Sequence, residues 1–144
     1  MTPTLRKSSV ENTESKGGVV IVDYGMGNLR SVEKAFEANG ARPKISSLVK
    51  DIENAQKLVV PGVGAFTHAI RELKARKLIG PIKDKLKSGT PYLGICLGLQ
   101  LLFSRSEEGE RVKGLDLIAG GVVRFKGKMK IPHMGWNTLE LKKK

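Results

Sequence analysis

The strongest constraint on the fold of this 144-residue chain is a repeated order of apolar run, glycine-rich turn and helical pattern. The apolar runs are residues 19–22, 58–60 and 92–95. Continuous apolar runs of this length are typical of strands that are buried on both faces. Strands that alternate with helices predict an α/β fold, in which a mostly parallel, doubly wound sheet carries helices on both faces.

The segments between the runs carry the 3.6-residue period of amphipathic helices. Residues 29–39 form one such pattern, which Gly40 closes, and a second pattern follows Gly64. We also expect a short strand at 44–46, a short helix with Asp51 as its N-cap, a helix at 82–87 and an apolar helix at 97–103.

The pattern changes at both ends of the chain. Residues 1–17 are polar and without periodicity, which predicts a disordered extension and leaves 18–144 as one domain. Beyond residue 103 we expect late antiparallel strands at the margin of the sheet. The expected elements are a charged loop at 104–113, a strand at 122–125, a hairpin turn at Gly127-Lys128 and a last strand at 138–141.

The formal net charge of +12 makes nucleic acid a candidate partner, because basic surfaces bind phosphates. However, the basic residues are spread along the chain, and two tyrosines and one tryptophan offer little for base stacking. Solvated helix faces are the simpler explanation of the charge, and an acidic protein partner is a third, so the charge alone does not identify a partner. We therefore expect no nucleic-acid partner.

Cysteine and histidine usage restricts the chemistry further. One cysteine excludes an internal disulfide, which suits a reducing cytoplasm, and no apolar run approaches membrane-spanning length. One cysteine and two separated histidines do not make a metal site. The turn after residue 22 resembles a dinucleotide loop, but Arg30 stands where its third glycine is needed. We expect a cytoplasmic protein without membrane contact, metal or cofactor.

The single cysteine, Cys96, lies between Gly94 and Gly98, after an apolar run and before an apolar helical pattern. This order is that of a nucleophile elbow, in which small neighbours allow a tight, strained turn and the helix start favours the thiolate. A buried core cysteine is the alternative, and spacing alone leaves both open. All three glycine-rich turns fall at the carboxyl ends of strands, where parallel sheets bind ligands, and this convergence favours catalysis.

A cysteine nucleophile needs an oxyanion hole and a general base. The turn Pro61-Gly62-Val63-Gly64 can aim backbone amides into a pocket, although an ordinary strand-to-helix turn has the same composition. His68 is expected on the solvated side of a helix, and His133 in a packed apolar segment. These residues do not assemble a Cys-His-acid triad.

Four motifs occur in order between residues 19 and 141 and together resemble the class I glutamine amidotransferase subunits of imidazole glycerol phosphate synthase, which act in histidine biosynthesis. The resemblance implies a flavodoxin-like fold and a glutaminase that uses no cofactor. The motifs are Val22-Asp23-Tyr24-Gly25-Met26-Gly27-Asn28-Leu29, Pro61-Gly62-Val63-Gly64-Ala65-Phe66, Gly94-Ile95-Cys96-Leu97-Gly98-Leu99-Gln100 and Pro132-His133-Met134-Gly135-Trp136-Asn137.

The resemblance also implies roles for single residues. Cys96 would attack the side-chain amide of L-glutamine, form a glutamyl thioester and release ammonia. Gly62, Val63 and the amide of Leu97 would form the oxyanion hole. Gln100 and Glu108 would hold the substrate, with Glu108 facing its α-amino group.

The partner implied by the resemblance is the cyclase subunit, a (β/α)8 barrel that forms a heterodimer with the glutaminase. The ammonia would pass through an internal tunnel to the cyclase, which makes imidazole glycerol phosphate. The residues that match the face toward this partner are Asn28, Met134, Trp136 and Asn137.

Family members are longer than this chain, and their catalytic histidine and glutamate lie in a part beyond residue 144. We therefore expect a C-terminally incomplete domain, with apolar sheet surface exposed and weak activity by itself. Two alternatives follow: a non-catalytic module that only docks on the cyclase, or a related amidotransferase that feeds a different synthase.

Overall fold

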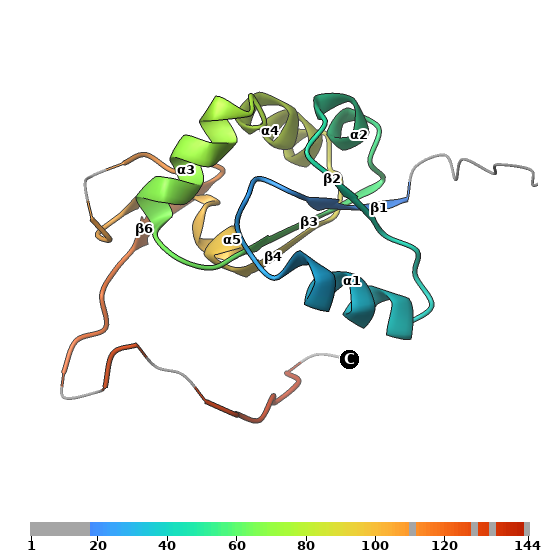
Figure 1. Ribbon diagram of the computed structural model, residues 1–144. Coiled ribbons are helices and arrows are strands. Elements are labelled where there is room, and N and C mark those ends of the chain that lie inside the picture. Colours follow the sequence, from blue (N-terminus) through green and yellow to red (C-terminus); the bar gives the residue numbers. More distant parts are fainter. Residues whose placement is uncertain (1–17, 110–111, 128–129, 133–134, 143–144) are drawn as a thin grey trace, which may run out of the picture.

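The computed structural model describes residues 18–109, 112–127, 130–132 and 135–142. The predicted N-terminal extension, residues 1–17, lies outside this part of the chain. The described residues form a four-stranded parallel sheet, flanked by helices, and a smaller two-stranded sheet (Figure 1). The predicted α/β class is therefore confirmed.

The central sheet has the strand order β2-β1-β3-β4, with every neighbouring pair parallel. This is the order of a flavodoxin-like doubly wound sheet, in which the chain reverses direction across the sheet between β1 and β3. The strands are β1 (Val19–Val22), β2 (Lys44–Ser46), β3 (Lys57–Gly62) and β4 (Tyr92–Cys96).

Helices lie on both faces of this sheet (Figure 1). One face is covered by α2 (Val49–Glu53), α3 (Phe66–Ala75) and α4 (Ile79–Lys87), and the other by α1 (Leu29–Ala38). The predicted stripe of α3 is fully buried and joins the main core, because its period of 3.6 keeps these side chains on one face. The stripe consists of Phe66, Ala69, Ile70 and Leu73.

Along each strand, successive side chains point to opposite faces of the sheet. Val20, Leu58 and Val60 join the core beneath α3 and α4, whereas Ile21 and Val59, at the alternate positions, are buried outside that cluster. Leu93 continues the row of Val59 onto β4, at the edge of the sheet, and is 48% exposed. With Ile95 and Leu99, also exposed, it leaves apolar surface uncovered at this edge among the described residues, as the sequence predicts.

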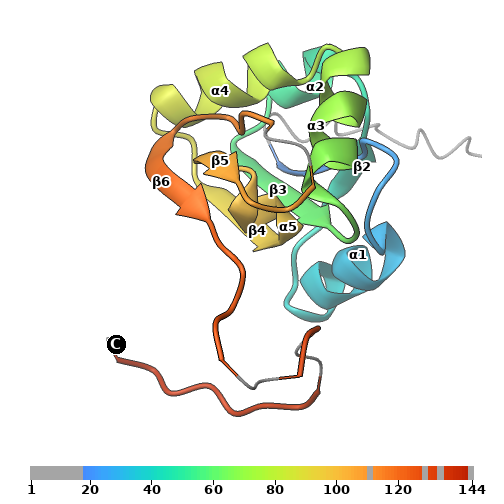
Figure 2. The same cartoon turned by 90° about the vertical axis from the view of Figure 1, so that its left-hand side faces the viewer.

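The prediction of late antiparallel strands is wrong. After α5 (Leu97–Gln100) come β5 (Phe103–Ser106) and β6 (Ile118–Val122), which pair parallel beside the main sheet (Figure 2). The cause is a return of the chain between them. Buried Leu115 donates its amide to the Leu101 carbonyl, and Leu117 donates to Leu102, so the second strand starts near the beginning of the first.

Several predicted boundaries shift for the same reason. The expected loop 104–113 begins with a strand, the expected helix 97–103 ends at Gln100, and the strand expected at 122–125 lies earlier, at β6. No strand is found at 138–141 among the described residues, and Lys128 of the expected hairpin turn lies outside them. Backbone hydrogen bonds to residues 101–103 determine where these elements lie. Because β5 contains polar side chains, hydrophobic periodicity does not identify it as a strand in the sequence.

The two short helices also differ from expectation. Leu48, not Asp51, is the N-cap of α2, because the Asp51 carboxylate instead binds the Ser46 hydroxyl and lies 2.7 Å from the Lys44 ammonium. Helix α4 begins at Ile79, before the expected start at residue 82. None of the described helices is long and apolar enough to cross a membrane.

Two glycines allow the β4–α5 junction to pack closely. A Cβ atom at Gly98 would lie 1.7 Å from the Val60 carbonyl oxygen of β3. A Cβ atom at Gly94 would lie 2.6 Å from the Leu99 nitrogen. Both distances are far below van der Waals contact, so this approach of backbone to backbone excludes any side chain.

We expect Gly98→Ala to lower the free energy of unfolding by about 2 kcal/mol or more, because the added methyl group must displace β3 or α5. The matched control is Gly80→Ala, since Gly80 lies in α4 with open space around its Cβ position. There, alanine should change the free energy of unfolding by less than about 0.5 kcal/mol, because its lower backbone entropy is offset by the restriction that Pro81 places on the preceding residue. Urea unfolding followed by circular dichroism measures both, and equal stability of the two variants would contradict the packing described.

Candidate active site

Cys96 is the last residue of β4 and the N-cap of α5, with φ 54° and ψ −112°. A non-glycine residue rarely adopts positive φ, and such a conformation costs about 1–3 kcal/mol. The side chain is exposed, which rules out the alternative of a buried core cysteine. Strand, strained turn and short helix thus follow one another as the nucleophile elbow requires.

The turn Pro61-Gly62-Val63-Gly64, which is predicted to supply oxyanion amides and is called the oxyanion turn below, meets the elbow at Gly62. This glycine ends β3 and pairs in register with Cys96. A Cβ atom on Gly62 would lie 3.0 Å from the Leu97 Cβ atom. Val63 follows Gly62 directly and is exposed. The structure therefore brings together the predicted nucleophile and the three residues predicted to supply oxyanion amides.

Tyr24 lies beneath this junction and is fully buried. Its hydroxyl donates to the Pro61 carbonyl at 2.8 Å. Burial raises the pKa of Tyr24 to about 12, and the nearby Cys96 adds to the rise because a thiolate disfavours a phenolate. Tyr24 therefore stays a neutral hydrogen-bond donor at physiological pH. The sequence offers one signal for it, a tyrosine two residues after the end of a buried strand.

A second tyrosine holds the other side of the elbow. The Tyr92 hydroxyl donates to the Gly98 carbonyl of α5 at 2.7 Å. Burial, with a smaller contribution from Tyr24, holds the pKa of Tyr92 well above its usual value. Both phenols thus remain protonated, and each binds a backbone carbonyl next to a close glycine contact. Neither contact was foreseen from the sequence.

Glu108 lies at the start of α3, just after the oxyanion turn, although it is 42 residues from Phe66 in sequence. Its carboxylate accepts a hydrogen bond from the backbone nitrogen of Phe66, the first residue of α3, at 3.3 Å. The N-cap residue Ala65 has no side chain that could do this, and a carboxylate at a helix start is favourable. The hydroxyl of buried Ser106 fixes the loop by accepting from the Glu108 nitrogen at 3.0 Å.

The remaining candidate residues are Gln100 and the two histidines, His68 and His133. Gln100 ends α5, four residues after Cys96, and is half-buried. His68 is exposed on α3, as predicted, and His133 lies outside the described residues. Within the described ranges, no group of three or more His, Cys, Asp or Glu residues could hold a metal ion.

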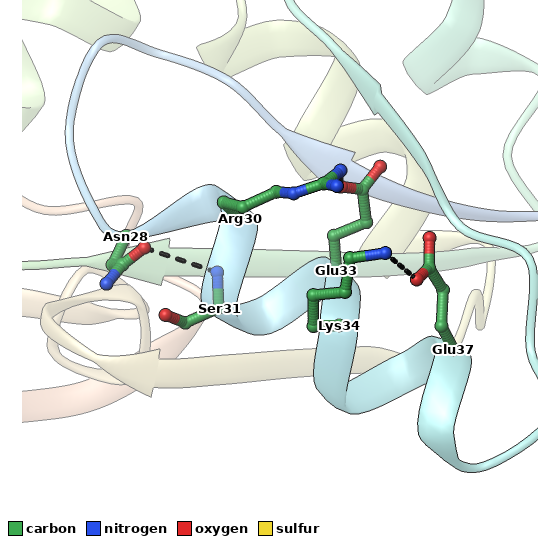
Figure 3. A network of polar contacts seen from close by, with 6 residues as sticks. All are labelled: Asn28, Arg30, Ser31, Glu33, Lys34 and Glu37. Atoms are coloured by element: carbon green, nitrogen blue, oxygen red, sulfur yellow. Dashed lines mark hydrogen bonds and ion pairs between the residues drawn. The ribbon is translucent and has the colours of Figure 1, made fainter.

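Three of the four residues predicted to face a partner lie within the described part of the chain. Asn28 caps α1, with its side chain accepting from the Ser31 nitrogen at 3.2 Å (Figure 3). Trp136 and Asn137 are exposed in the segment after β6, which runs away from the sheet (Figure 1). Met134 lies outside the described residues. Figure 3 also shows the exposed ion pairs of α1, Arg30–Glu33 and Lys34–Glu37.

Proteins of similar sequence include several named as imidazole glycerol phosphate synthase subunit HisH. The chain is 51% identical over 126 residues to that of Rhodopirellula baltica, covering 86% of this chain and 62% of the other. It is 52% identical over 124 residues to that of Gloeothece citriformis, covering 85% and 58%. It is 51% identical over 125 residues to that of Methanosarcina barkeri, covering 86% and 61%. The chain thus spans less than two-thirds of the length of these relatives.

Solved structures share the fold. A crystal structure described as a glutamine amidotransferase superposes with a TM-score of 0.64 at 23% identity, covering 74% of this chain and 57% of that one. A putative peptidase E protein from Listeria monocytogenes superposes with a TM-score of 0.58 at 13% identity, covering 74% and 65%. At these identities the likeness concerns the fold alone.

The family comparison agrees with the elbow geometry and the strand order. The profile of the class-I glutamine amidotransferases matches residues 20–143, which is nearly all of the described structure. The chain therefore belongs to the class-I glutamine amidotransferase family.

Proposed function

We propose that this chain is the glutaminase part of an imidazole glycerol phosphate synthase and acts in the hydrolysis of L-glutamine to glutamate and ammonia. The observation that carries the proposal is the exposed Cys96 at a strained elbow, paired in register with Gly62 of the oxyanion turn. The names of relatives at about half identity support the choice of pathway.

In the proposed reaction, the Cys96 sulfur attacks the side-chain carbonyl carbon of glutamine, and the carbonyl oxygen takes up negative charge. Amides of Gly62, Val63 and Leu97 stabilise this oxyanion, which is the largest single contribution in many acyl transfers. The C–N bond then breaks, ammonia leaves with a proton, and a glutamyl thioester remains. Water attacks the thioester and releases glutamate, restoring the thiol.

Proton transfer to and from these groups requires a general base. The family resemblance assigns this role to a histidine and a glutamate that are not among the 144 residues, and the exposed position of His68 on α3 offers no substitute. We propose that full turnover requires this pair. The elbow and the oxyanion turn account for the nucleophilic half of the chemistry.

For the substrate, we propose that Glu108 binds the α-amino group of glutamine and that Gln100 contacts its polar groups. The Glu108 carboxylate is held at the start of α3 by the Phe66 nitrogen, so one of its oxygens is already oriented. An ammonium group is the natural partner for the remaining oxygen. Gln100 ends α5, four residues after Cys96.

For the partner, we propose a heterodimer with the cyclase subunit, a (β/α)8 barrel that receives the ammonia and, as a lyase, forms imidazole glycerol phosphate. The word "subunit" in the names of the relatives supports the existence of a partner. The contacts proposed are Asn28, Met134, Trp136 and Asn137. Since the nucleophile is a free thiol, a reducing compartment such as the cytoplasm suits the enzyme.

A second candidate is a module that docks on the cyclase without hydrolysing glutamine. Trp136 favours it, because a fully exposed tryptophan is typical of a binding hot spot. A third is a related amidotransferase that serves a different synthase. The two experiments that follow separate catalysis from docking.

Cys96→Ala should abolish glutamine hydrolysis by the chain together with its cyclase subunit, with a loss of about 10³-fold or more, because the covalent step has no other nucleophile. Ammonia release is the measurement. His68→Ala is the control and should keep the activity, since His68 is exposed outside the site. Turnover that survives Cys96→Ala would contradict the glutaminase proposal, and no turnover in the unaltered complex would show that the 144-residue chain is not a working enzyme by itself.

Trp136→Ala should weaken binding to the cyclase subunit by about 30-fold, which corresponds to a typical hot-spot loss of about 2 kcal/mol. Leu139→Ala is the matched control, because Leu139 is also highly exposed but lies outside the proposed interface. Cys96→Ala should bind unchanged. Titration calorimetry measures all three, and equal effects of the Trp136 and Leu139 variants would exclude the proposed interface.

A further inference from the structure

Two neighbouring glutamates follow β5, and the structure gives them different partners. Glu107 is bound to the segment of β6 and the residues after it. Its backbone nitrogen donates to the Val122 carbonyl at 2.9 Å, and its carboxylate accepts from the Arg124 nitrogen at 3.1 Å. The Glu108 carboxylate is bound to α3, where it accepts from the Phe66 nitrogen. Of these two carboxylates, that of Glu108 is therefore the one that lies beside the oxyanion turn.

Ser106 holds the backbone of Glu108. It is the last residue of β5, is 3% exposed, and pairs in register with Val122 of β6. Its hydroxyl oxygen accepts a hydrogen bond from the Glu108 nitrogen at 3.0 Å. The next residue, Gly109, lies against the first turn of α3, since a Cβ atom there would be 3.4 Å from the Thr67 hydroxyl oxygen. The backbone of Glu108 is thus anchored to the small sheet, and its carboxylate to α3.

We propose that Ser106 is a positioning residue for recognition of the substrate α-amino group: its hydroxyl holds the Glu108 backbone so that the carboxylate stays oriented toward an ammonium ligand. This inference rests on the proposed function, in which Glu108 binds the α-amino group of glutamine. An ionised carboxylate has about four acceptor positions, and the Phe66 nitrogen uses one of them. A carboxylate that is already held loses little freedom when the ligand binds, and this preorganisation strengthens binding.

Positioning of Glu108 predicts a different result from a general loss of stability. Removing the Ser106 hydroxyl should weaken the binding of a ligand that carries the α-amino group, and should leave a ligand without that group unaffected. Glutaramic acid is such a ligand, because it has the amide and the carboxyl group of L-glutamine but no α-amino group. The ratio of the two affinities therefore reports the Glu108 contact separately from the fold and from the thiol.

The test measures how a bound ligand protects Cys96 in the 144-residue chain, a reaction that needs no general base from elsewhere. Iodoacetamide alkylates the exposed thiol: the thiolate sulfur bonds to the methylene carbon, and iodide leaves. A ligand bound over Cys96 slows alkylation, so its dissociation constant follows from the rate at increasing ligand concentration. Cys96→Ala gives the background. L-Glutamine should bind the unaltered chain about tenfold more tightly than glutaramic acid, as is typical of a hydrogen bond between charged groups.

In Ser106→Ala this preference for L-glutamine should fall by about fivefold, while the affinity for glutaramic acid and the alkylation rate without ligand change less than about twofold. Ser104→Ala is the matched control. Ser104 is a half-buried serine of the same strand, but its hydroxyl donates to the Ile118 carbonyl and does not contact Glu108. The preference should therefore be unchanged in Ser104→Ala.

A double-mutant cycle shows whether Ser106 acts through Glu108. Glu108→Gln removes the charge and should abolish the preference for L-glutamine, so adding Ser106→Ala should lower it no further. Glu107→Gln is the control for the charge change and should keep the preference, because the Glu107 carboxylate binds the Arg124 nitrogen.

Three outcomes would overturn the positioning role while leaving the proposed function supported: an unchanged preference in Ser106→Ala, an equal fall in Ser104→Ala, or a further fall when Ser106→Ala is added to Glu108→Gln. Equal binding of both ligands by the unaltered chain would overturn the proposed role of Glu108, and the inference with it. Protection of Cys96 by neither ligand would overturn glutamine binding and the inference together.

Circular dichroism establishes that each variant is folded. If Ser106→Ala is not, Ser106→Thr and Ser106→Val take its place, because these two side chains have nearly the same shape and only threonine has a hydroxyl. The preference for L-glutamine should be higher in Ser106→Thr than in Ser106→Val. Equal preferences in the two variants would overturn the positioning role.

Discussion

The close approach of the β4–α5 junction to β3 is the constraint on which the rest of this structure depends. Three glycines, at 62, 94 and 98, stand where a Cβ atom would collide with backbone or with the Tyr24 hydroxyl. Once the chain is packed this tightly, it leaves β4 and enters α5 through a turn that only a positive φ at Cys96 can make. The strain at the cysteine is thus maintained by packing around it.

The same approach organises the polar groups of the candidate site. Two phenols, those of fully buried Tyr24 and half-buried Tyr92, donate to the carbonyls of Pro61 and Gly98 at the junction. Their desolvation keeps them neutral and hence donors. Glu108 binds the start of α3 from a distant part of the chain. Thiol, oxyanion turn and carboxylate are therefore fixed by the fold, before any ligand is present.

The net charge of +12 plays little part in this arrangement. The ion pairs on α1 lie at the surface, one helical turn apart, where water and salt screen them, so they contribute little to the stability of the fold. Asp51 of α2 is a polar side chain that binds residues of a strand instead of capping its own helix. Its carboxylate binds Lys44 and Ser46 of β2. The hydrogen bond from Lys44, and to a smaller extent that from Ser46, lowers the pKa of the Asp51 carboxyl. The start of α2 is therefore left without a side-chain cap.

The sequence by itself determined the elements that repeat a local pattern. The strands of the central sheet, the stripe of α3, the glycine turns and the elbow order around Cys96 all follow from periodicity and from glycine, which act over a few residues. Only the tertiary structure decided the parallel direction of β6, the cap that Glu108 gives α3, and the bond from Tyr24 to Pro61. These depend on backbone groups brought together over distances of up to 42 residues, and no local pattern encodes which distant carbonyl or amide a side chain will meet.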